Sequence, residues 1–455
     1  MSHETAVLDP VTEIDPPRDE TVAPAILSGP PESRNTDLPE WFRARQAEAW
    51  TRFASMPMPT RNDQAWRFSN VKALDLAPFV VSEDVESDVR HELLERSNSL
   101  DEAAGRLIYA DDYLLRRDPL PEKLRSLGVI LKPLERGLIE HEELFRKHFM
   151  SQPTGLGSAK FAALHEAFVR SGTLVYVPRG VEVELPIEIF HWLSGENTSV
   201  FPHTLLIADE LAKVSVVEHF RSAHARTRGF ACGVNDLVVG RGAKITYVCV
   251  QNWNENVVSL QMNTTTAERD ASAKSLNVHL GGAYSRFESL SRITGEGGRS
   301  DLLSISVGAG AQEFDARTLQ NHASPHTTSD LLYKNALGDS SRATFGGLIR
   351  VEPHAHFTDA YQTVRNLLLS DDAEANSMPG LEIMADNVKC SHGATSGQIA
   401  DDELFYLLAR GIPKNVAHRL LVTGFLNEVV KRLDHPAIGA RLHDLIEEKF
   451  ARGPR

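Results

Sequence analysis

A cysteine and a histidine stand two residues apart near the end of the chain, in the string "KCSHGATSG" of residues 389–397. Thiolate and imidazole are ligands that iron and zinc prefer, so Cys390 and His392 could bind a metal together. On a helix their side chains would point about 200° apart, whereas residues i and i+2 of a strand share one face. The two residues form half of a metal site only if a strand positions them.

Two ligands leave such a site incomplete, because zinc and iron usually take about four. The other ligands would have to come from elsewhere in this chain or from a partner protein. On spacing alone the alternative is favoured: a buried free cysteine beside a hydrogen-bonded histidine. The chain has 18 histidines, so further pairs are expected by chance, namely His354 with His356 and His322 with His326.

The sequence carries no recognisable catalytic motif. It has no G-x-x-x-x-G-K-[ST] loop, so we expect no nucleotide to be bound by this chain. The glycine strings "GRGAK" and "GEGGRS" are followed by strand patterns rather than by a helix, which excludes a dinucleotide fingerprint. Neither G-x-S-x-G nor H-E-x-x-H occurs. The chain is therefore not itself a P-loop ATPase, and it shows none of these other catalytic motifs.

The segment that carries the cysteine and histidine belongs to a long run of strand patterns, residues 171–400. "LEIMADNVKCSHGATSG" reads as a strand with an exit of small residues. Segments of this run resemble one another at a period of about 30 residues, which is typical of a repeat architecture. The clearest repeated pairs are Ala212-Lys213, Ala243-Lys244 and Ala273-Lys274. Strand repeats without helices between them predict a parallel β-helix, ahead of an immunoglobulin-like sandwich.

Helical patterns flank this β-helix core. Residues 39–170 are predicted to form an α-rich N-terminal domain, which begins with a helix in "LPEWFRARQAEAWTRFASMPMP". Residues 401–455 are predicted to form a C-terminal helical domain, whose first helix covers "DELFYLLAR" and ends at Gly411. Residues 1–38 are rich in proline and acidic residues and are predicted to be a disordered acidic tail.

The overall charge and the cysteines restrict the partners and the compartment. A net charge of −14 argues against binding to nucleic acid or to an anionic membrane. No apolar run approaches the roughly 20 residues that span a bilayer, and "MSHETAVLDP" has no features of a secretory signal. The three cysteines, Cys232, Cys249 and Cys390, are odd in number and far apart. We therefore expect free thiols and a cytoplasmic location.

One long string gives a specific resemblance. "TDAYQTVRNLLLSDDAEANSMPGLEIMADNVKCSHGATSGQIADDELFYLLARGI" strongly resembles the SufB/SufD family of iron–sulfur cluster assembly proteins. The likeness runs from about residue 158 to the C-terminus, and is weaker over "LPEWFRARQAEAWTRF" and "QAWRFSNV". "AYQTVRNLLLS" and "CSHGAT" are more similar to SufD than to SufB. The SufB string has glutamates where this chain has Ser391 and Gly393.

The resemblance implies a mainly β fold, a right-handed parallel β-helix flanked by N-terminal and C-terminal α-helical domains. It implies pairing with SufB through the β-helix end that carries Cys390 and His392, and docking of the SufC ATPase on the C-terminal helices. Iron or an iron–sulfur cluster would be bound transiently and shared with SufB, with Cys390 and His392 as ligands facing outward from their strand. His354 and His356 are set aside as ligands. The residues expected at the SufC contact are Phe405, Tyr406, Arg410 and Gly411.

Together these features predict a non-catalytic scaffold subunit of the SUF complex that supports iron acquisition and cluster assembly. One alternative is a purely structural subunit, in which Cys390 and His392 only pack. A second is a carbohydrate-active β-helix enzyme, although the chain shows no export signal and no obvious ladder of acidic residues. A homodimer of the isolated chain also remains open.

Overall fold

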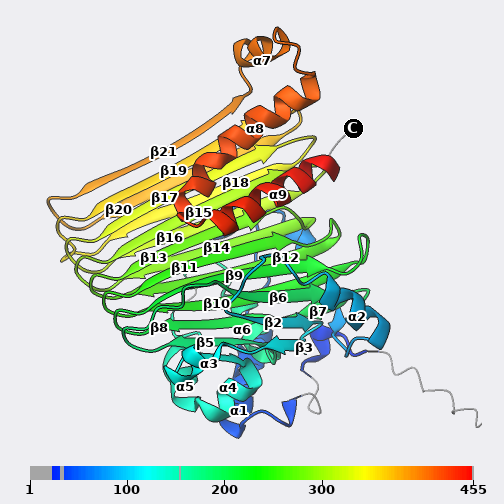
Figure 1. Cartoon of the computed structure of the whole chain (residues 1–455), viewed down its shortest axis with the longest axis vertical. Coiled ribbons are helices and arrows are strands. Elements are labelled where there is room, and N and C mark those ends of the chain that lie inside the picture. Colours follow the sequence, from blue (N-terminus) through cyan, green and yellow to red (C-terminus); the bar gives the residue numbers. More distant parts are fainter. Residues whose placement is uncertain (1–22, 31–34, 153–154, 453–455) are drawn as a thin grey trace, which may run out of the picture.

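The repeated strands wind into a parallel β-helix with two sheets (Figure 1). The structure is a computed structural model that describes residues 23–30, 35–152 and 155–452. The first sheet runs through β4 (Ile130–Pro133), β5 (Gly172–Val177), β8 (His203–Ala208), β10 (Gly229–Val239), β12 (Val257–Ala267), β14 (Tyr284–Ile293), β16 (Glu313–His322), β18 (Arg342–Val351) and β20 (Glu374–Ile383), with β1 (Val80–Val81) and β7 (Thr198–Val200) at its side.

The second sheet lies opposite the first. It runs through β3 (Tyr113–Asp118), β2 (Gly105–Ala110), β6 (Ile187–Leu193), β9 (Lys213–Ser222), β11 (Lys244–Asn252), β13 (Ser272–His279), β15 (Arg299–Gly308), β17 (Thr328–Leu337), β19 (Asp359–Leu368) and β21 (Lys389–Gln398). From β8 onward, successive strands of the chain alternate between the sheets, so one coil contributes one strand to each. Every named pair from β5 onward is parallel except β4 with β5, which confirms the predicted parallel β-helix.

The sequence repeat gives the coil length but not every register. Lys213 of β9 pairs with Lys244 of β11, as the repeated Ala-Lys pairs require. The third Ala-Lys pair, at Lys274, is out of register by two residues. Lys244 pairs with Ser272, and Lys274 pairs with Thr246. The coil from Lys244 to Ser272 is therefore three residues shorter than the coil from Lys213 to Lys244.

A column of left-handed residues forms where each strand of the first sheet turns into the second. The turns after β8, β10 and β12 have positive φ angles at Leu211, Gly242 and Asp270. The N–H of each donates to a backbone carbonyl in the next turn, for example Leu211 to Arg241. The later members of this turn column are Gly297, His326, Phe357 and Asn387.

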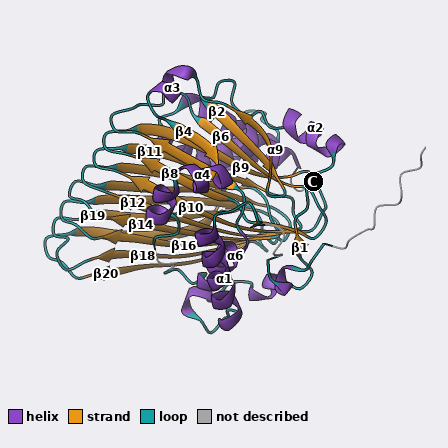
Figure 2. Ribbon diagram, turned by 90° about the horizontal axis from the view of Figure 1, so that it is seen from below, coloured by secondary structure: helices purple, strands orange, loops and turns teal. Residues whose placement is uncertain are grey.

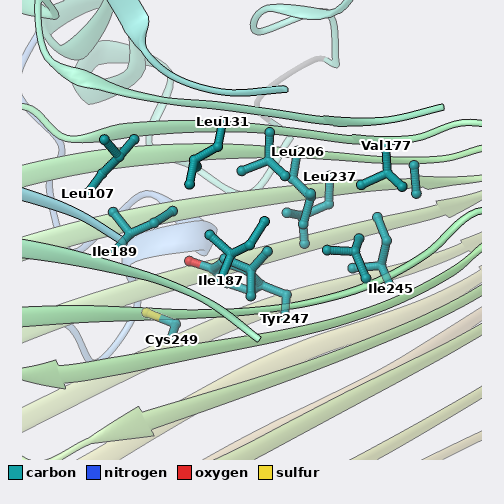
Figure 3. Close-up of a cluster of buried hydrophobic side chains, with 14 of the residues drawn as sticks. Leu107, Leu131, Val177, Ile187, Ile189, Leu206, Leu237, Ile245, Tyr247 and Cys249 are labelled. Atoms are coloured by element: carbon teal, nitrogen blue, oxygen red, sulfur yellow. The ribbon is translucent and has the colours of Figure 1, made fainter. Parts of the chain in front are cut away.

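The interior between the sheets changes character along the β-helix. Near its N-terminal end it is mostly apolar, and Figure 3 shows Ile187, Leu206, Leu237 and Ile245 directed toward one another there. The exception is a buried hydrogen-bonded cluster around Glu218. From about β12 onward, many interior positions are buried and polar. They include Asn263, Ser275, Asn277, Ser289, Ser304, Thr318, Gln320, Asn335 and Gln362. The coils near the C-terminal end are thus held together partly by hydrogen bonds between interior side chains.

Helices cover the outer faces. The N-terminal helices are α1 (Glu40–Ser55), α2 (Ser87–Glu95), α3 (Glu122–Ser126), α4 (Leu134–Glu140), α5 (Glu142–His148) and α6 (Ala159–Phe168), with short 3₁₀ helices at Ile26–Ser28, Gln64–Trp66 and Val71–Leu74. α1 and α6 lie side by side (Figure 2), and α6 contacts β10 of the first sheet. Phe161 and Leu164 of α6 share one apolar cluster with Cys232 and Leu260 of the sheet.

The C-terminal helices are α7 (Asp401–Leu408), α8 (Lys414–Val430) and α9 (Pro436–Arg452), with a 3₁₀ turn at Lys431–Leu433. α8 crosses the outer face of β15 and β17, and its Leu426 and Val429 pack in one cluster with Leu303 and Leu332. Lys334 of β17 fixes the crossing by donating to the Phe425 carbonyl oxygen at 2.7 Å. Among the described residues, no helix combines the length and apolar character needed to cross a membrane.

The N-terminal region is more β-rich than its helical patterns suggest. β2 and β3 form a hairpin that joins the second sheet through β6, and β4 joins the first through β5. Asp111 and Asp112 make the hairpin turn with positive φ angles. Residues 39–170 therefore contribute strands to the same two sheets as the core. The predicted boundaries between domains stay a prediction.

The prediction of a disordered tail over residues 1–38 is wrong for the part that the structure describes. Ile26 is fully buried, and its N–H donates to the Phe79 carbonyl oxygen at 3.0 Å. The Val81 N–H donates to the Pro24 carbonyl oxygen at 2.9 Å. Burial of Ile26 and these backbone hydrogen bonds thus hold residues 24–26 beside β1. The rest of the predicted tail, residues 1–22 and 31–34, lies outside the described residues.

Candidate functional site

β21 carries Cys390 and His392 on one face, as their spacing requires. Cys390 is in register with Ala360 of β19, and His392 is in register with Gln362. Ala360 and Gln362 are buried, whereas Tyr361 between them is exposed. Because register neighbours on parallel strands share a face, Cys390 and His392 face the interior of the β-helix. The expected outward orientation is therefore wrong.

Both residues are nevertheless accessible, because the β-helix is open at this end. β20 and β21 are the last members of their sheets, and no strand of the described residues pairs with their free edges (Figure 1). His392 is exposed and Cys390 is half-buried. Each of the two strands has ten residues, so the end presents two long edges of unpaired backbone groups. Such edges are a template for pairing with another chain.

Cys390 rests on an apolar surface. It packs against a cluster of Ile349, Val351, Ala355 and Ala360. Burial raises the pKa of the Cys390 thiol, and the carboxylate of Asp359 raises it further. The thiol is thus protonated at neutral pH, and a metal that binds the sulfur must displace that proton.

The structure supplies no further ligands beside this pair. In the described ranges, no group of three or more His, Cys, Asp or Glu residues is arranged to hold a metal ion. His322 is buried in the interior, while His326 stacks on Phe357 in the turn column outside, so these two do not form a ligand pair. Cys390 and His392 remain a half-site whose donor atoms suit iron, zinc or an iron–sulfur cluster. A second protein at the open end would have to complete it.

α7 presents a second exposed surface. Phe405 is 71% exposed and Tyr406 is 55% exposed, and no residue of α7 is buried. The Arg410 guanidinium lies 4.1 Å from the Tyr406 ring centroid, and Gly411 ends the segment with a φ of +81°. α7 contacts α8 and stands away from the body of the β-helix (Figure 1). Exposed apolar clusters of this kind mark sites of protein–protein contact.

The exposed apolar surface also includes Leu408 at the end of α7 and Leu420 on α8. Reasoning from the sequence did not select these two residues. A signal was present, because "LFYLL" is apolar on every side of the helix it forms, and a helix that is apolar all round must be covered by something.

The fold is a parallel β-helix with one open end and an exposed helix, α7, beyond its last strand. The chain belongs to the SufB/SufD family. Residues 191–425 match the family "SUF system FeS cluster assembly, SufBD core domain", and residues 35–189 match "SufBD protein N-terminal region".

Two relatives in Bacillus subtilis are similar over most of their length. The chain is 28% identical to "Iron-sulfur cluster assembly protein SufD", covering 90% of this chain and 94% of the relative. It is 27% identical to "Iron-sulfur cluster assembly protein SufB", covering 88% of each. A SufBD family protein of Staphylococcus epidermidis is 28% identical over 69% of this chain and 67% of its own length. The resemblance to the family is confirmed, while the choice of SufD over SufB stays a prediction.

Proposed function

We propose that the chain is a non-catalytic scaffold subunit of the SUF complex, most similar in role to SufD, which pairs with SufB and docks the SufC ATPase. The observation that carries this proposal is the open end of the β-helix. Cys390 and His392 lie there on the interior face of β21, beside two unpaired edges of ten residues. A partner with its own strand edges would extend the sheets and bring further ligands to the half-site.

In this proposal iron or an iron–sulfur cluster is cargo, bound transiently between the two proteins. His392 contributes more than Cys390, because a neutral imidazole binds iron without losing a proton. The Cys390 thiol must first release the proton that burial stabilises. This chain supplies the platform, and ATP hydrolysis belongs to the SufC partner.

The test is to co-purify the chain with SufB and SufC and to measure iron, sulfide and melting temperature on each preparation. His392→Ala should lower the iron and sulfide recovered while the melting temperature stays unchanged, because the side chain is exposed. Cys390→Ser should give a similar but smaller loss. Ser396→Ala is the matched control, since Ser396 is exposed on the same face of β21 but carries no metal-binding donor of this kind.

The purely structural alternative predicts the opposite pattern. Iron and sulfide would stay constant in His392→Ala and Cys390→Ser, and only stability would change. Full cluster content in His392→Ala would therefore refute the shared site. Membership in the SufB/SufD family argues against a carbohydrate-active enzyme.

We propose further that α7 is the SufC dock. Phe405, Tyr406 and Leu408 form an exposed apolar surface, and the Arg410 charge lies over the Tyr406 ring. Aromatic residues and arginine are enriched at the centres of protein interfaces. Because α7 buries none of its residues, substitutions there test binding without emptying a core.

Arg410→Glu and Phe405→Ala should each weaken capture of SufC while circular dichroism stays unchanged. Arg241→Glu is the control, since Arg241 is an exposed arginine in the turn column. Undiminished capture by both α7 variants would count against this dock. Size-exclusion chromatography of the isolated chain would separately test whether the open ends of two copies associate as a homodimer.

A further inference from the structure

Gln362 lies directly beside the candidate ligand His392, one strand deeper in the β-helix. The two residues are register neighbours on adjacent strands and share the interior face. Gln362 is only 1% exposed, yet its side-chain oxygen Oε1 has no hydrogen-bond partner among the described residues. A buried acceptor without a donor is rare in folded proteins, so each one requires an explanation.

We propose that Gln362 is a positioning residue for His392, whose Oε1 accepts the N–H of one imidazole nitrogen and leaves the other nitrogen free to bind metal. This inference rests on the proposed function, because it concerns the same half-site. It adds a residue inside the β-helix to the two that reach the open end.

The orientation of the Gln362 amide follows from its neighbours. The side-chain nitrogen Nε2 of Gln320 lies 3.2 Å from the Tyr361 backbone oxygen, which can only accept a hydrogen bond. Gln320 must therefore present its NH₂ group to Tyr361 and its Oε1 to Gln362. Gln362 must in turn donate its own Nε2–H to Gln320 Oε1, at 3.1 Å. The remaining atom of the Gln362 amide is Oε1, which is an acceptor.

The same hydrogen-bond chain is fixed at its other end. Thr327 donates its hydroxyl proton to the Ser324 backbone oxygen at 3.0 Å, so it accepts from His322 Nδ1 at 2.7 Å. Neutral His322 then accepts at Nε2 from the Ser329 hydroxyl, at 2.8 Å. Ser329 Oγ in turn accepts from Gln320 Nε2 at 2.8 Å. The protons of Thr327, His322, Ser329 and Gln320 thus each have an acceptor, and the pKa of His322, which burial lowers to about 4, agrees with its neutral form.

A histidine that binds metal usually donates its other ring N–H to a carbonyl, a carboxylate or water, which fixes the tautomer and the direction of the ring. Gln362 Oε1 is a carbonyl oxygen, within reach of His392 across a strand spacing of about 4.8 Å. The register neighbour of Cys390 is Ala360, which has no side-chain acceptor and hydrogen-bonds the sulfur through its backbone instead. A side-chain acceptor thus lies beside the imidazole but not beside the thiol.

The first test needs no metal. Histidine is labelled with ¹⁵N in the full chain, and two-bond ¹H–¹⁵N correlation spectra report which ring nitrogen of His392 carries the proton; His392→Ala assigns the signal. We expect one dominant tautomer in the natural sequence and a mixture in Gln362→Met, which keeps the length but removes the acceptor. Gln261→Met, at an interior position of β12, is the matched control and should leave the His392 signal unchanged. A mixture of tautomers in the unsubstituted chain refutes the contact whether or not any variant folds.

The second test uses Co²⁺ as the probe, titrated into the complex with SufB and followed by absorbance. Gln362→Met should weaken Co²⁺ binding by about 10- to 100-fold, the usual effect of removing an outer-shell partner. If His392→Ala abolishes binding while Gln362→Met leaves it unchanged, the positioning role is wrong and the half-site stands. If His392→Ala leaves Co²⁺ binding unchanged, the half-site is wrong, and the tautomer spectra alone decide whether Gln362 contacts His392.

Discussion

Replacing Arg286 with methionine should destabilise the protein far more than the loss of any surface charge. Arg286 of β14 is fully buried on the outer face of the first sheet, beneath the N-terminal segments. Its guanidinium contacts Glu288 at 2.7 Å and Asp315 at 2.6 Å and lies 3.8 Å from the Trp66 ring centroid. It also donates to the backbone oxygens of Ala65 and Leu156.

Burial alone disfavours the charged guanidinium, but Asp315 and Glu288 outweigh it and hold the pKa of Arg286 above its ordinary value. Methionine would leave both carboxylates buried with one cation fewer, and breaking a buried pair in this way costs about 3–5 kcal/mol. Arg317 still contacts Asp315 at 2.8 Å, so we expect the lower half of that range. Arg299 is the matched control, because its side chain is 44% exposed and its ion pair with Asp301 is in contact with water. Arg299→Met should lower the free energy of unfolding by less than about 1 kcal/mol.

Urea unfolding followed by tryptophan fluorescence measures this difference, because buried tryptophans such as Trp66 and Trp192 become exposed on unfolding. Adding Glu288→Gln to Arg286→Met should recover part of the loss, because the stranded Glu288 charge is then removed while Asp315 keeps its pair with the buried Arg317. A loss of less than about 1 kcal/mol in the single variant would show that water or backbone movement relieves the stranded carboxylates, and the argument from burial would fail.

Three further outcomes are expected. Ile26→Ala should lower the free energy of unfolding by about 2–5 kcal/mol in urea titrations, whereas Leu27→Ala, at a 47% exposed neighbour, should not. Stability should fall as the pH drops from about 6.5 to 4, since His322 has a folded pKa of about 4 and the unfolded chain takes up the proton first. Its contribution is about 3 kcal/mol, and His322→Gln should reduce the pH dependence of the melting temperature without abolishing it, because the pKa of buried His279 is also lowered to about 4. Gly172→Ala should give no soluble protein in expression trials, because φ is +152° and the new Cβ would lie 2.1 Å from a backbone oxygen of β8.

The main architecture was predictable from the sequence because it depends on local patterns. The repeat of about 30 residues gave the β-helix, and the helical pattern of "DELFYLLAR" gave α7 (Asp401–Leu408). The shared face of Cys390 and His392 followed from the strand period. Their orientation toward the interior did not follow, since it depends on the register of β21 with β19, which no local pattern fixes.

The features that sequence reasoning missed all depend on contacts between distant segments. Ile26 lies in the short apolar run "AIL" between prolines and acids, and only its packing in one cluster with Phe79 distinguishes it from a residue in a disordered tail. Arg286 draws its partners from β16 and from the loops around Ala65 and Leu156. Gln362 is oriented by Gln320, 42 residues earlier in the chain. No spacing rule connects such residues.

The open end of the β-helix has a consequence for the order in which the molecule loosens. An inner coil has a neighbour on both sides, whereas the coil of β20 and β21 has one. In a stack of this kind, local opening starts at an uncovered end and moves inward, because each coil removed exposes the next. Amide hydrogens of β21 should therefore exchange with deuterium first, followed by those of β19, while β11 and β13 exchange slowly. A protein bound across that end would slow amide exchange in β21 most and in the strands behind it less. The exchange rates of the second-sheet strands from β21 back to β11 would therefore measure how completely a partner covers the open end.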